Sequence, residues 1–106
     1  MSRAVFLDRD GTIIEDHPYN SRPDAVFLLP HVAPALARLR DAGFLLILTT
    51  NQSGIGRGYF PSTVVEAQHA RLAAILAEAN LAFAAVKYCP HTPDDGCDCR
   101  KPAPGM

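Results

Sequence analysis

The feature of this sequence that most constrains its fold is a run of four apolar residues, Ala4-Val5-Phe6-Leu7, that ends in two carboxylates. An unbroken apolar run is typical of a strand buried on both faces, as in a parallel sheet. Asp8 and Asp10 follow the run, and Gly11 then marks a turn of the chain. The run therefore predicts a strand that carries two acidic side chains to its carboxyl end, where open α/β sheets bind their ligands.

The two carboxylates need compensation for their charge. Negative side chains held this close repel each other unless a cation or a shared proton offsets them. Oxygen ligands of this kind suit a hard divalent cation, so Asp8 and Asp10 are candidate ligands of Mg²⁺. A solvated acidic turn is the alternative interpretation. The buried run before the pair and the polar loops farther along the chain argue against it.

Helices and strands alternate along the rest of the chain. Apolar residues at helical spacing, with Gly43 as a C-terminal cap, predict a helix that opens at residues 30–31. Residues 44–48 form a second unbroken apolar strand. Thr63 and Glu66 fit a capping box at the start of a long helix. Further expected elements are a short strand at residues 25–29 and a third, weaker strand at residues 84–88.

This order of elements predicts an open α/β fold with right-handed crossovers, a parallel sheet and helices on both of its faces. A length of 106 residues allows one domain, and 48% hydrophobic with 20% charged residues is typical of a globular protein rather than a disordered chain. The net charge of −1 favours neither nucleic acid nor an anionic membrane as a partner. Because we see no long apolar segment and no secretory signal, we expect a cytoplasmic protein.

A second polar loop follows the second strand. Thr50, Asn51, Gln52 and Ser53 stand beside three glycines within residues 51–60. Glycines let backbone N–H groups approach a ligand, and hydroxyl and amide side chains suit a phosphate or a developing oxyanion. A flexible connection between strand and helix is the alternative. The hypothesis of a ligand loop gains support because this loop is predicted to lie at the same end of the sheet as the acidic pair.

The third constellation gathers every cysteine of the chain beside one histidine. Cys89, His91, Cys97 and Cys99 offer three thiolates and an imidazole, which is a complete tetrahedral shell for zinc. A disulfide would leave one thiol over, and simple packing of buried cysteines fits poorly with so polar a segment. Because such a shell has no open position, we expect residues 89–99 to form a structural zinc loop.

Together these segments resemble the haloacid dehalogenase superfamily of phosphohydrolases. Asp8-x-Asp10-Gly11-Thr12 matches the first motif of the superfamily, Thr50-Asn51 the second and Lys101 the third. The resemblance covers nearly the whole chain. Within the superfamily, the resemblance is most specific to a branch that acts on heptose bisphosphates, and it rests on the zinc loop, residues 100–106 and residues 51–55. The related histidinol phosphatases are the alternative.

The resemblance implies a Mg²⁺-dependent enzyme that hydrolyses a phosphate monoester. Asp8 would be the nucleophile that forms an aspartyl-phosphate, and Asp10 would be the general acid and then the general base. Mg²⁺ would bind the Asp8 carboxylate and the Asp10 backbone carbonyl, while Thr50 and Lys101 would hold the transferring phosphoryl group. The residues expected to contact the substrate are Arg100, Asn51, Gln52, Ser53, Asp16, His17 and Tyr19.

One departure from the superfamily pattern concerns the fourth motif, whose acidic residues complete the magnesium site. This motif would follow the third one, and the sequence ends at Met106. We therefore expect residues 1–106 to be the N-terminal portion of a single phosphatase domain. The first strand would then be an apolar edge, open to self-association or to a partner chain. A non-catalytic zinc-binding module is the remaining alternative.

Overall fold

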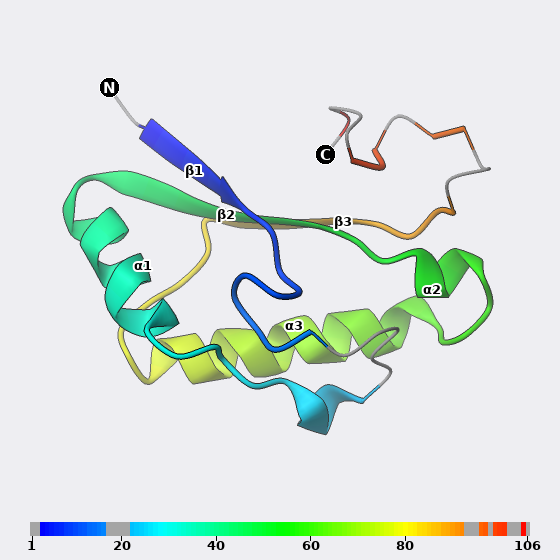
Figure 1. The fold of residues 1–106 in the computed structure, drawn as a ribbon, viewed down its shortest axis with the longest axis horizontal. Coiled ribbons are helices and arrows are strands. Elements are labelled where there is room, and N and C mark those ends of the chain that lie inside the picture. Colours follow the sequence, from blue (N-terminus) through cyan, green and yellow to red (C-terminus); the bar gives the residue numbers. More distant parts are fainter. Residues whose placement is uncertain (1–2, 17–21, 93–95, 98, 102–104, 106) are drawn as a thin grey trace.

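A parallel sheet organises the computed structural model, which describes residues 3–16, 22–92, 96–97, 99–101 and 105. Its strands lie side by side in the order β1 (Arg3–Leu7), β2 (Phe44–Asn51) and β3 (Ala85–Cys89), as Figure 1 shows. β2 pairs in parallel with both neighbours, with Leu7 opposite Leu48 and Thr50 opposite Tyr88. The expected parallel sheet is confirmed, and β2 is its central strand.

The helices of the described residues connect these strands. α1 (Val32–Asp41) lies between β1 and β2 in sequence, and α3 (Ser62–Ala77) lies between β2 and β3. Two shorter elements are η1 (Pro23–Ala25), a 3₁₀ turn, and α2 (Ser53–Gly56), a single helical turn. Gly43 follows α1 with a φ of 92°, which glycine adopts without strain, so the predicted end of this helix is confirmed. Among the helices described, none has the length and apolar character needed to cross a membrane.

The hydrophobic core lies between the sheet and the two long helices. Every second residue of β1 and β2 faces it, because successive side chains of a strand point to opposite sides. One side of each long helix closes it from below in Figure 1. The main contributors from these elements are Val5, Leu7, Val32, Leu36, Leu46, Leu48, Leu72 and Leu76.

The opposite face of the sheet exposes apolar side chains. Phe6 of β1 is 65% exposed and Leu45 of β2 is 47% exposed, whereas α1 and α3 both lie on the other side of the sheet (Figure 1). The prediction of helices on both faces is therefore wrong for the described part of the chain. The reason is topological, because right-handed crossovers that advance in one direction, from β1 to β2 to β3, place their helices on the same face.

The short strand predicted at residues 25–29 is reduced to one isolated antiparallel bridge between Ile14 and Leu28. Two backbone hydrogen bonds flank this bridge: Glu15 N–H donates to the Phe27 carbonyl, and Leu29 N–H donates to the Ile13 carbonyl. The residues before it turn into η1, where a proline stands in the first turn. Proline has a φ suited to that position, so the local sequence favours a turn over a longer strand.

The predicted capping box of Thr63 and Glu66 is wrong. α3 begins at Ser62 with Pro61 at the N-cap, and no side chain makes a capping hydrogen bond there. Thr63 is the second residue of the helix, so its hydroxyl does not occupy the N-cap position from which a capping oxygen acts. The connection expected at residues 51–60 also contains more structure than predicted, because it includes the end of β2 and all of α2.

Candidate active site and metal cluster

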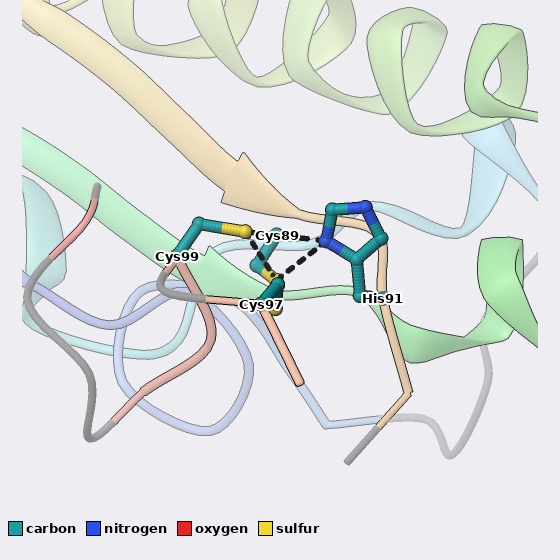
Figure 2. Close-up of side chains that lie close together, drawn as sticks. All are labelled: Cys89, His91, Cys97 and Cys99. Carbon is teal, nitrogen blue, oxygen red and sulfur yellow. Dashed lines mark hydrogen bonds between the residues drawn. The ribbon is translucent and has the colours of Figure 1, made fainter. Parts of the chain in front are cut away.

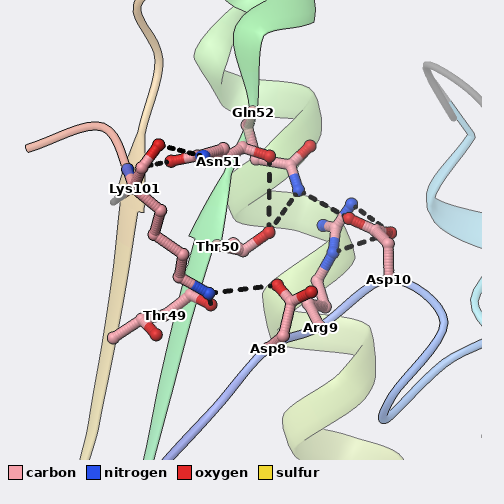
Figure 3. Close-up of polar contacts among 8 residues, drawn as sticks. All are labelled: Asp8, Arg9, Asp10, Thr49, Thr50, Asn51, Gln52 and Lys101. Carbon is pink, nitrogen blue, oxygen red and sulfur yellow. Dashed lines mark hydrogen bonds and ion pairs between the residues drawn. The ribbon is translucent and has the colours of Figure 1, made fainter. Parts of the chain in front are cut away.

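The carboxyl ends of β1 and β2 bring the predicted catalytic residues together (Figure 3). Asp8 and Asp10 follow β1, Thr50 lies near the end of β2, and Lys101 reaches the same place from the segment after β3. The Lys101 Nζ donates to Asp8 Oδ1 at 3.2 Å and to the Thr49 carbonyl at 2.6 Å. The fold thus sets a lysine charge against an aspartate that lies 93 residues away in sequence.

The two carboxylates have different surroundings. The Asp8 side chain is 53% exposed and pairs with the Lys101 ammonium, so an incoming ligand can reach it. Asp10 Oδ1 accepts hydrogen bonds from the Arg9 guanidinium, at 3.2 Å from Nε and 2.9 Å from Nη2, and Asp10 Oδ2 accepts one from Gln52 Nε2 at 3.0 Å. An accessible carboxylate beside a lysine can act as a nucleophile, and a carboxylate held at both oxygens is suited to directed proton transfer.

Gln52 connects the acidic pair to the second motif. Besides Asp10, its Nε2 contacts Thr50 Oγ1, which accepts a hydrogen bond at 2.9 Å. Both Gln52 and Thr50 are buried, so this link lies beneath the rim of the site. The Gln52 amide nitrogen therefore points at Asp10 and Thr50, and its predicted contact with a sugar stays a prediction.

Asn51 holds the segment that carries Lys101. Its side-chain Oδ1 accepts from the Lys101 backbone N–H at 2.9 Å, and its Nδ2 donates to the Lys101 carbonyl at 3.4 Å. Figure 3 shows the two residues joined in this way above Thr50. The amide of Asn51 is thus engaged with protein backbone, and a direct substrate contact of this side chain stays a prediction.

The predicted zinc ligands converge at the end of β3, which Cys89 closes, and in the segment that follows (Figure 2). The four ligand atoms of Cys89, His91, Cys97 and Cys99 all lie within 4.8 Å of one another. Cys99 Sγ lies 2.7 Å from Cys89 Sγ and 3.3 Å from His91 Nδ1, and Cys97 Sγ lies 3.4 Å from Cys89 Sγ. Three sulfurs and one imidazole nitrogen form a donor set that structural zinc prefers, so these residues fit that metal.

Crowding alters the acidity of these thiols. Hydrogen bonding with Cys89 raises the pKa of Cys99 to about 12. Burial opposes ionisation of Cys97, but hydrogen bonds with Cys89 and with the Arg100 backbone outweigh it and lower the pKa of Cys97 to about 7. One thiol thus ionises at the expense of its neighbour, as expected for like charges that share a site. A bound divalent cation would allow all of them to ionise together.

Backbone contacts tie this metal cluster to the loop after β2. Gln52 N–H donates to the Cys89 carbonyl at 2.7 Å, and Gly56 N–H donates to the Pro90 carbonyl at 2.8 Å. A Cβ on Gly56 would lie 2.7 Å from the Pro90 oxygen, so a residue without a side chain is required there. The glycines of this loop are expected to let backbone approach a phosphate. At Gly56 the close neighbour is instead the segment of residues 89–99 that carries the zinc ligands, called the metal loop below.

The remaining predicted substrate residues lie around the site or outside the described part. Arg100 Nη1 donates to the His91 carbonyl at 3.3 Å, so this guanidinium contacts the metal loop. Ser53 Oγ accepts from Arg57 Nε at 3.4 Å, and Asp16 is exposed in the loop after β1. His17 and Tyr19 lie outside the described residues. The substrate roles of all five residues stay predictions; they are Asp16, His17, Tyr19, Ser53 and Arg100.

Sequence reasoning assigned no role to Arg9, although it stands between the two aspartates. Arg9 is buried, and its Nη1 donates to Gln68 Oε1 at 2.9 Å and to His69 Nε2 at 3.3 Å. His69 is half-buried beside it. One feature of the sequence could have indicated a buried polar partner for Arg9. Gln68 is a polar residue three positions after Val65 and four before Leu72, so it lies on the apolar side of α3.

An open α/β sheet that presents an Asp-x-Asp pair, a threonine and a lysine at one edge defines the class of haloacid dehalogenase-like proteins. The family described as polynucleotide kinase 3 phosphatase matches residues 3–106, and the chain belongs to this family. The predicted membership of a phosphatase superfamily is therefore confirmed.

Individual relatives agree with this assignment. D-glycero-beta-D-manno-heptose-1,7-bisphosphate 7-phosphatase of Pseudomonas aeruginosa is 49% identical over 108 residues, which cover 100% of this chain and 61% of that protein. The crystal structure of D,D-heptose 1.7-bisphosphate phosphatase from B. bronchiseptica, complexed with magnesium and phosphate, superposes with a TM-score of 0.89 at 42% identity and covers 98% of this chain and 59% of that one. A putative had-like phosphatase from Mesorhizobium loti gives a TM-score of 0.88 at 38% identity, over 99% of this chain and 54% of that one. The chain thus spans about 60% of the length of the first two relatives.

Proposed function

We propose that this chain carries the nucleophile and the acid–base residue of a Mg²⁺-dependent phosphatase that removes the 7-phosphate of D-glycero-D-manno-heptose 1,7-bisphosphate. The observation that carries the proposal is the contact of Lys101 with an accessible Asp8, beside an Asp10 whose two oxygens are held by other groups. Relatives named for heptose bisphosphates favour a sugar substrate over histidinol phosphate. Such a reaction would supply heptose for lipopolysaccharide precursors in the cytoplasm.

The first step of the proposed reaction links enzyme and phosphate. An oxygen of Asp8 attacks the phosphorus atom while the bond from phosphorus to the sugar oxygen breaks. Asp10 gives its proton to the departing oxygen, so the sugar leaves as an alcohol. Lys101 and the Thr50 hydroxyl stabilise the charge on the phosphoryl oxygens as it shifts during the transfer.

The second step releases the phosphate. Asp10, now ionised, accepts a proton from a water molecule whose oxygen attacks phosphorus, and the bond to Asp8 breaks. Inorganic phosphate leaves, and both carboxylates return to their starting states. Phosphate monoesters are among the slowest substrates to hydrolyse unaided and need accelerations of up to about 10²¹-fold. A covalent intermediate divides that barrier between two smaller ones.

Two metals belong to the proposal. The Asp8 carboxylate and the Asp10 backbone carbonyl would hold Mg²⁺, which neutralises phosphoryl charge when bound. The magnesium and phosphate in the B. bronchiseptica relative support this assignment. Zinc held by the four residues of the metal cluster would be structural, because four protein ligands leave no open position. That the acidic residues of a fourth motif complete the Mg²⁺ site of a single domain stays a prediction.

Mg²⁺-dependent release of phosphate from the heptose bisphosphate tests the proposal. The chain is assayed as it stands and also extended by the C-terminal segment that its relatives carry. We expect Asp8→Asn to abolish turnover and Asp41→Asn, an exposed aspartate at the end of α1, to leave it unchanged. Turnover that survives Asp8→Asn would contradict the mechanism. Faster hydrolysis of histidinol phosphate would reassign the substrate, and zinc binding without turnover in either form would favour the non-catalytic module.

We also propose that the outer edge of β1 takes up a strand from a second copy of the chain. Within the described residues β1 pairs with β2 alone, and Phe6 stands 65% exposed beside the unpaired backbone. Exposed apolar edge strands are templates for such pairing, and a lysine in them opposes it. We expect the mass measured by light scattering to rise with concentration for the wild type and to stay monomeric for Phe6→Lys. Equal masses for both proteins at all concentrations would refute this interface.

A further inference from the structure

Arg9 is the largest fully buried side chain in the described part of the chain, and it lies beside the proposed catalytic pair. It is 1% exposed, although a guanidinium is expensive to remove from water even when its N–H groups are satisfied. An apolar side chain of similar volume would fill the position without that cost. A buried arginine between two functional aspartates therefore points to a role other than stability.

Helix α3 holds the far end of this guanidinium. Gln68 is buried, and its Oε1 accepts a hydrogen bond from Arg9 Nη1 at 2.9 Å. His69 Nε2 lies 3.3 Å from the same nitrogen, and it must be the acceptor because a guanidinium has no lone pair to offer. Two consecutive residues of α3 thus fix the plane of the guanidinium from one side.

The other side of the guanidinium faces Asp10. Its Nε and Nη2 both donate to Asp10 Oδ1, at 3.2 Å and 2.9 Å, and Gln52 Nε2 donates to Asp10 Oδ2 at 3.0 Å. Two bonds from a cation stabilise negative charge on Oδ1 more than one neutral amide does on Oδ2. Oδ2 is therefore the oxygen that is left to carry a proton.

We propose that Arg9, anchored by Gln68 of α3, is a positioning residue that orients the Asp10 carboxylate so that Oδ2 delivers the proton to the leaving oxygen. The proposal rests on the proposed function, in which Asp10 is the general acid. A general acid must come within hydrogen-bond distance of the atom that it protonates, and small misplacements reduce its effect strongly. Arg9 itself touches neither the phosphate nor the leaving group in this scheme.

A comparison of leaving groups tests the proposal. Hydrolysis of an alkyl phosphate such as the heptose 7-phosphate depends on protonation of a poor leaving group, whereas p-nitrophenyl phosphate releases a stable phenolate and depends on it little. We expect Gln68→Leu, which removes the closer of the two α3 acceptors for Arg9, to slow the alkyl substrate at least about tenfold more than the aryl substrate. This loss would be part of the roughly 10²–10⁴-fold that a general acid contributes. Gln68→Glu keeps an acceptor and should restore the ratio of the two rates toward that of the wild type.

Two results of this comparison would overturn the proposal. One is that Gln68→Leu slows the alkyl and the aryl substrate equally. The other is that the ratio of the two rates in Gln68→Glu is no closer to the wild-type ratio than it is in Gln68→Leu. The exposed Arg71→Gln on the same helix is the matched control and should keep the wild-type ratio. Thermal unfolding followed by circular dichroism checks that each variant is folded at the assay temperature. Absence of Mg²⁺-dependent turnover on both substrates in the wild type, both as it stands and extended by the C-terminal segment, would instead refute the proposed function.

A spectroscopic measurement tests the anchoring without turnover. The Nε–H of Arg9 is buried and bonded to Asp10, so its resonance in a ¹H–¹⁵N spectrum should exchange slowly with water. We expect Gln68→Leu to accelerate this exchange at least about tenfold, because the guanidinium loses the shorter of its two contacts with α3 and keeps only the one with His69. An unchanged exchange rate in a folded Gln68→Leu protein would overturn the proposal whatever the assays give.

Discussion

The side-chain amide of Asn51 pairs with both backbone groups of Lys101, accepting from its N–H at 2.9 Å and donating to its carbonyl at 3.4 Å. Asn51 is the last residue of β2, so the central strand determines where Lys101 leaves the metal loop. From that point the lysine side chain reaches Asp8 and the Thr49 carbonyl. The amide pair therefore joins the strand end, the metal loop and the proposed nucleophile.

The first prediction concerns this pair. We expect Asn51→Ala to lower kcat/KM about tenfold, because loss of the hydrogen bonds, each worth about 1 kcal/mol, leaves the Lys101 ammonium less well placed. Comparison with Lys101→Ala and with the double variant in phosphatase assays checks the route of the effect. If Asn51 acts through Lys101, the double variant is no slower than Lys101→Ala alone. Losses that simply multiply would show that Asn51 acts independently.

The second prediction concerns the acid stability of the fold. The pKa of His69 is lowered to about 4, mainly by burial. The Arg9 charge also lowers this pKa, and its effect exceeds the opposing effect of the Asp10 charge. In the unfolded chain the histidine has an ordinary pKa near 6.5. Between pH 6.5 and pH 4 the unfolded state therefore binds a proton at His69 and the folded state does not. Stability contributed by neutral His69 is therefore full above pH 6.5 and is lost as the pH falls toward 4, by at most about 3 kcal/mol.

Urea unfolding of His69→Asn and the wild type at pH 7 and pH 4.5 checks this effect. We expect the free energy of unfolding of the wild type to fall more than that of the variant between the two pH values. Acid loosening of the metal cluster is common to both proteins and cancels in the comparison. Parallel declines of the two proteins would show that His69 carries no such linkage.

The third prediction concerns Gly56. A Cβ there would meet the Pro90 carbonyl oxygen, so Gly56→Ala must push the metal loop away from α2. We expect a loss of about 1–3 kcal/mol in the free energy of unfolding, as for other overpacked sites, and weaker zinc binding in a competition titration. Gly58→Ala is the matched control, because it adds strain at a φ of 77° but has open space. It should lose stability and keep the zinc affinity, and a wild-type zinc affinity in Gly56→Ala would contradict the prediction.

The fourth prediction concerns metal removal. Chelation should lower the midpoint of thermal unfolding, because binding of zinc to the folded cluster contributes to folding free energy. In a domain of this size each kcal/mol corresponds to about 4–8 °C. Added zinc should restore the midpoint and added Mg²⁺ should not, while Cys99→Ser should be insensitive to the chelator. A midpoint that chelation leaves unchanged in the wild type would argue against structural zinc.

Much of this arrangement follows from local patterns in the sequence. Unbroken apolar runs identified the cores of β1 and β2, and the carboxyl ends of parallel strands must meet at one edge, which places Asp8 near Thr50. Ligand type and number alone assembled Cys89, His91, Cys97 and Cys99 into one group. These predictions succeeded because each rests on a pattern that one segment or one residue type carries.

The rest depended on contacts between distant segments. The partnership of Arg9 with Gln68 joins a strand end to a helix 59 residues away, and only the polar residue on the apolar side of α3 pointed toward it. The close contact of Gly56 with the Pro90 carbonyl could not be predicted from the loop sequence. A glycine required beside a ligand and a glycine required beside the backbone look the same in sequence. That the helices of the described residues cover one face of the sheet could be predicted only with knowledge of the strand order.

The strand order also assigns unequal mechanical roles to the two halves of the site. Among the described strands, β2 ends in Thr50 and Asn51 and has a neighbour on each side, whereas β1 precedes Asp8 and Asp10 and has a neighbour on one side. The central strand is held on both sides, whereas the two carboxylates follow the strand at the border of the described sheet. The bonds from Lys101 to Asp8 and from Gln52 to Asp10 therefore tether the end of the border strand β1 to groups positioned by the central strand β2.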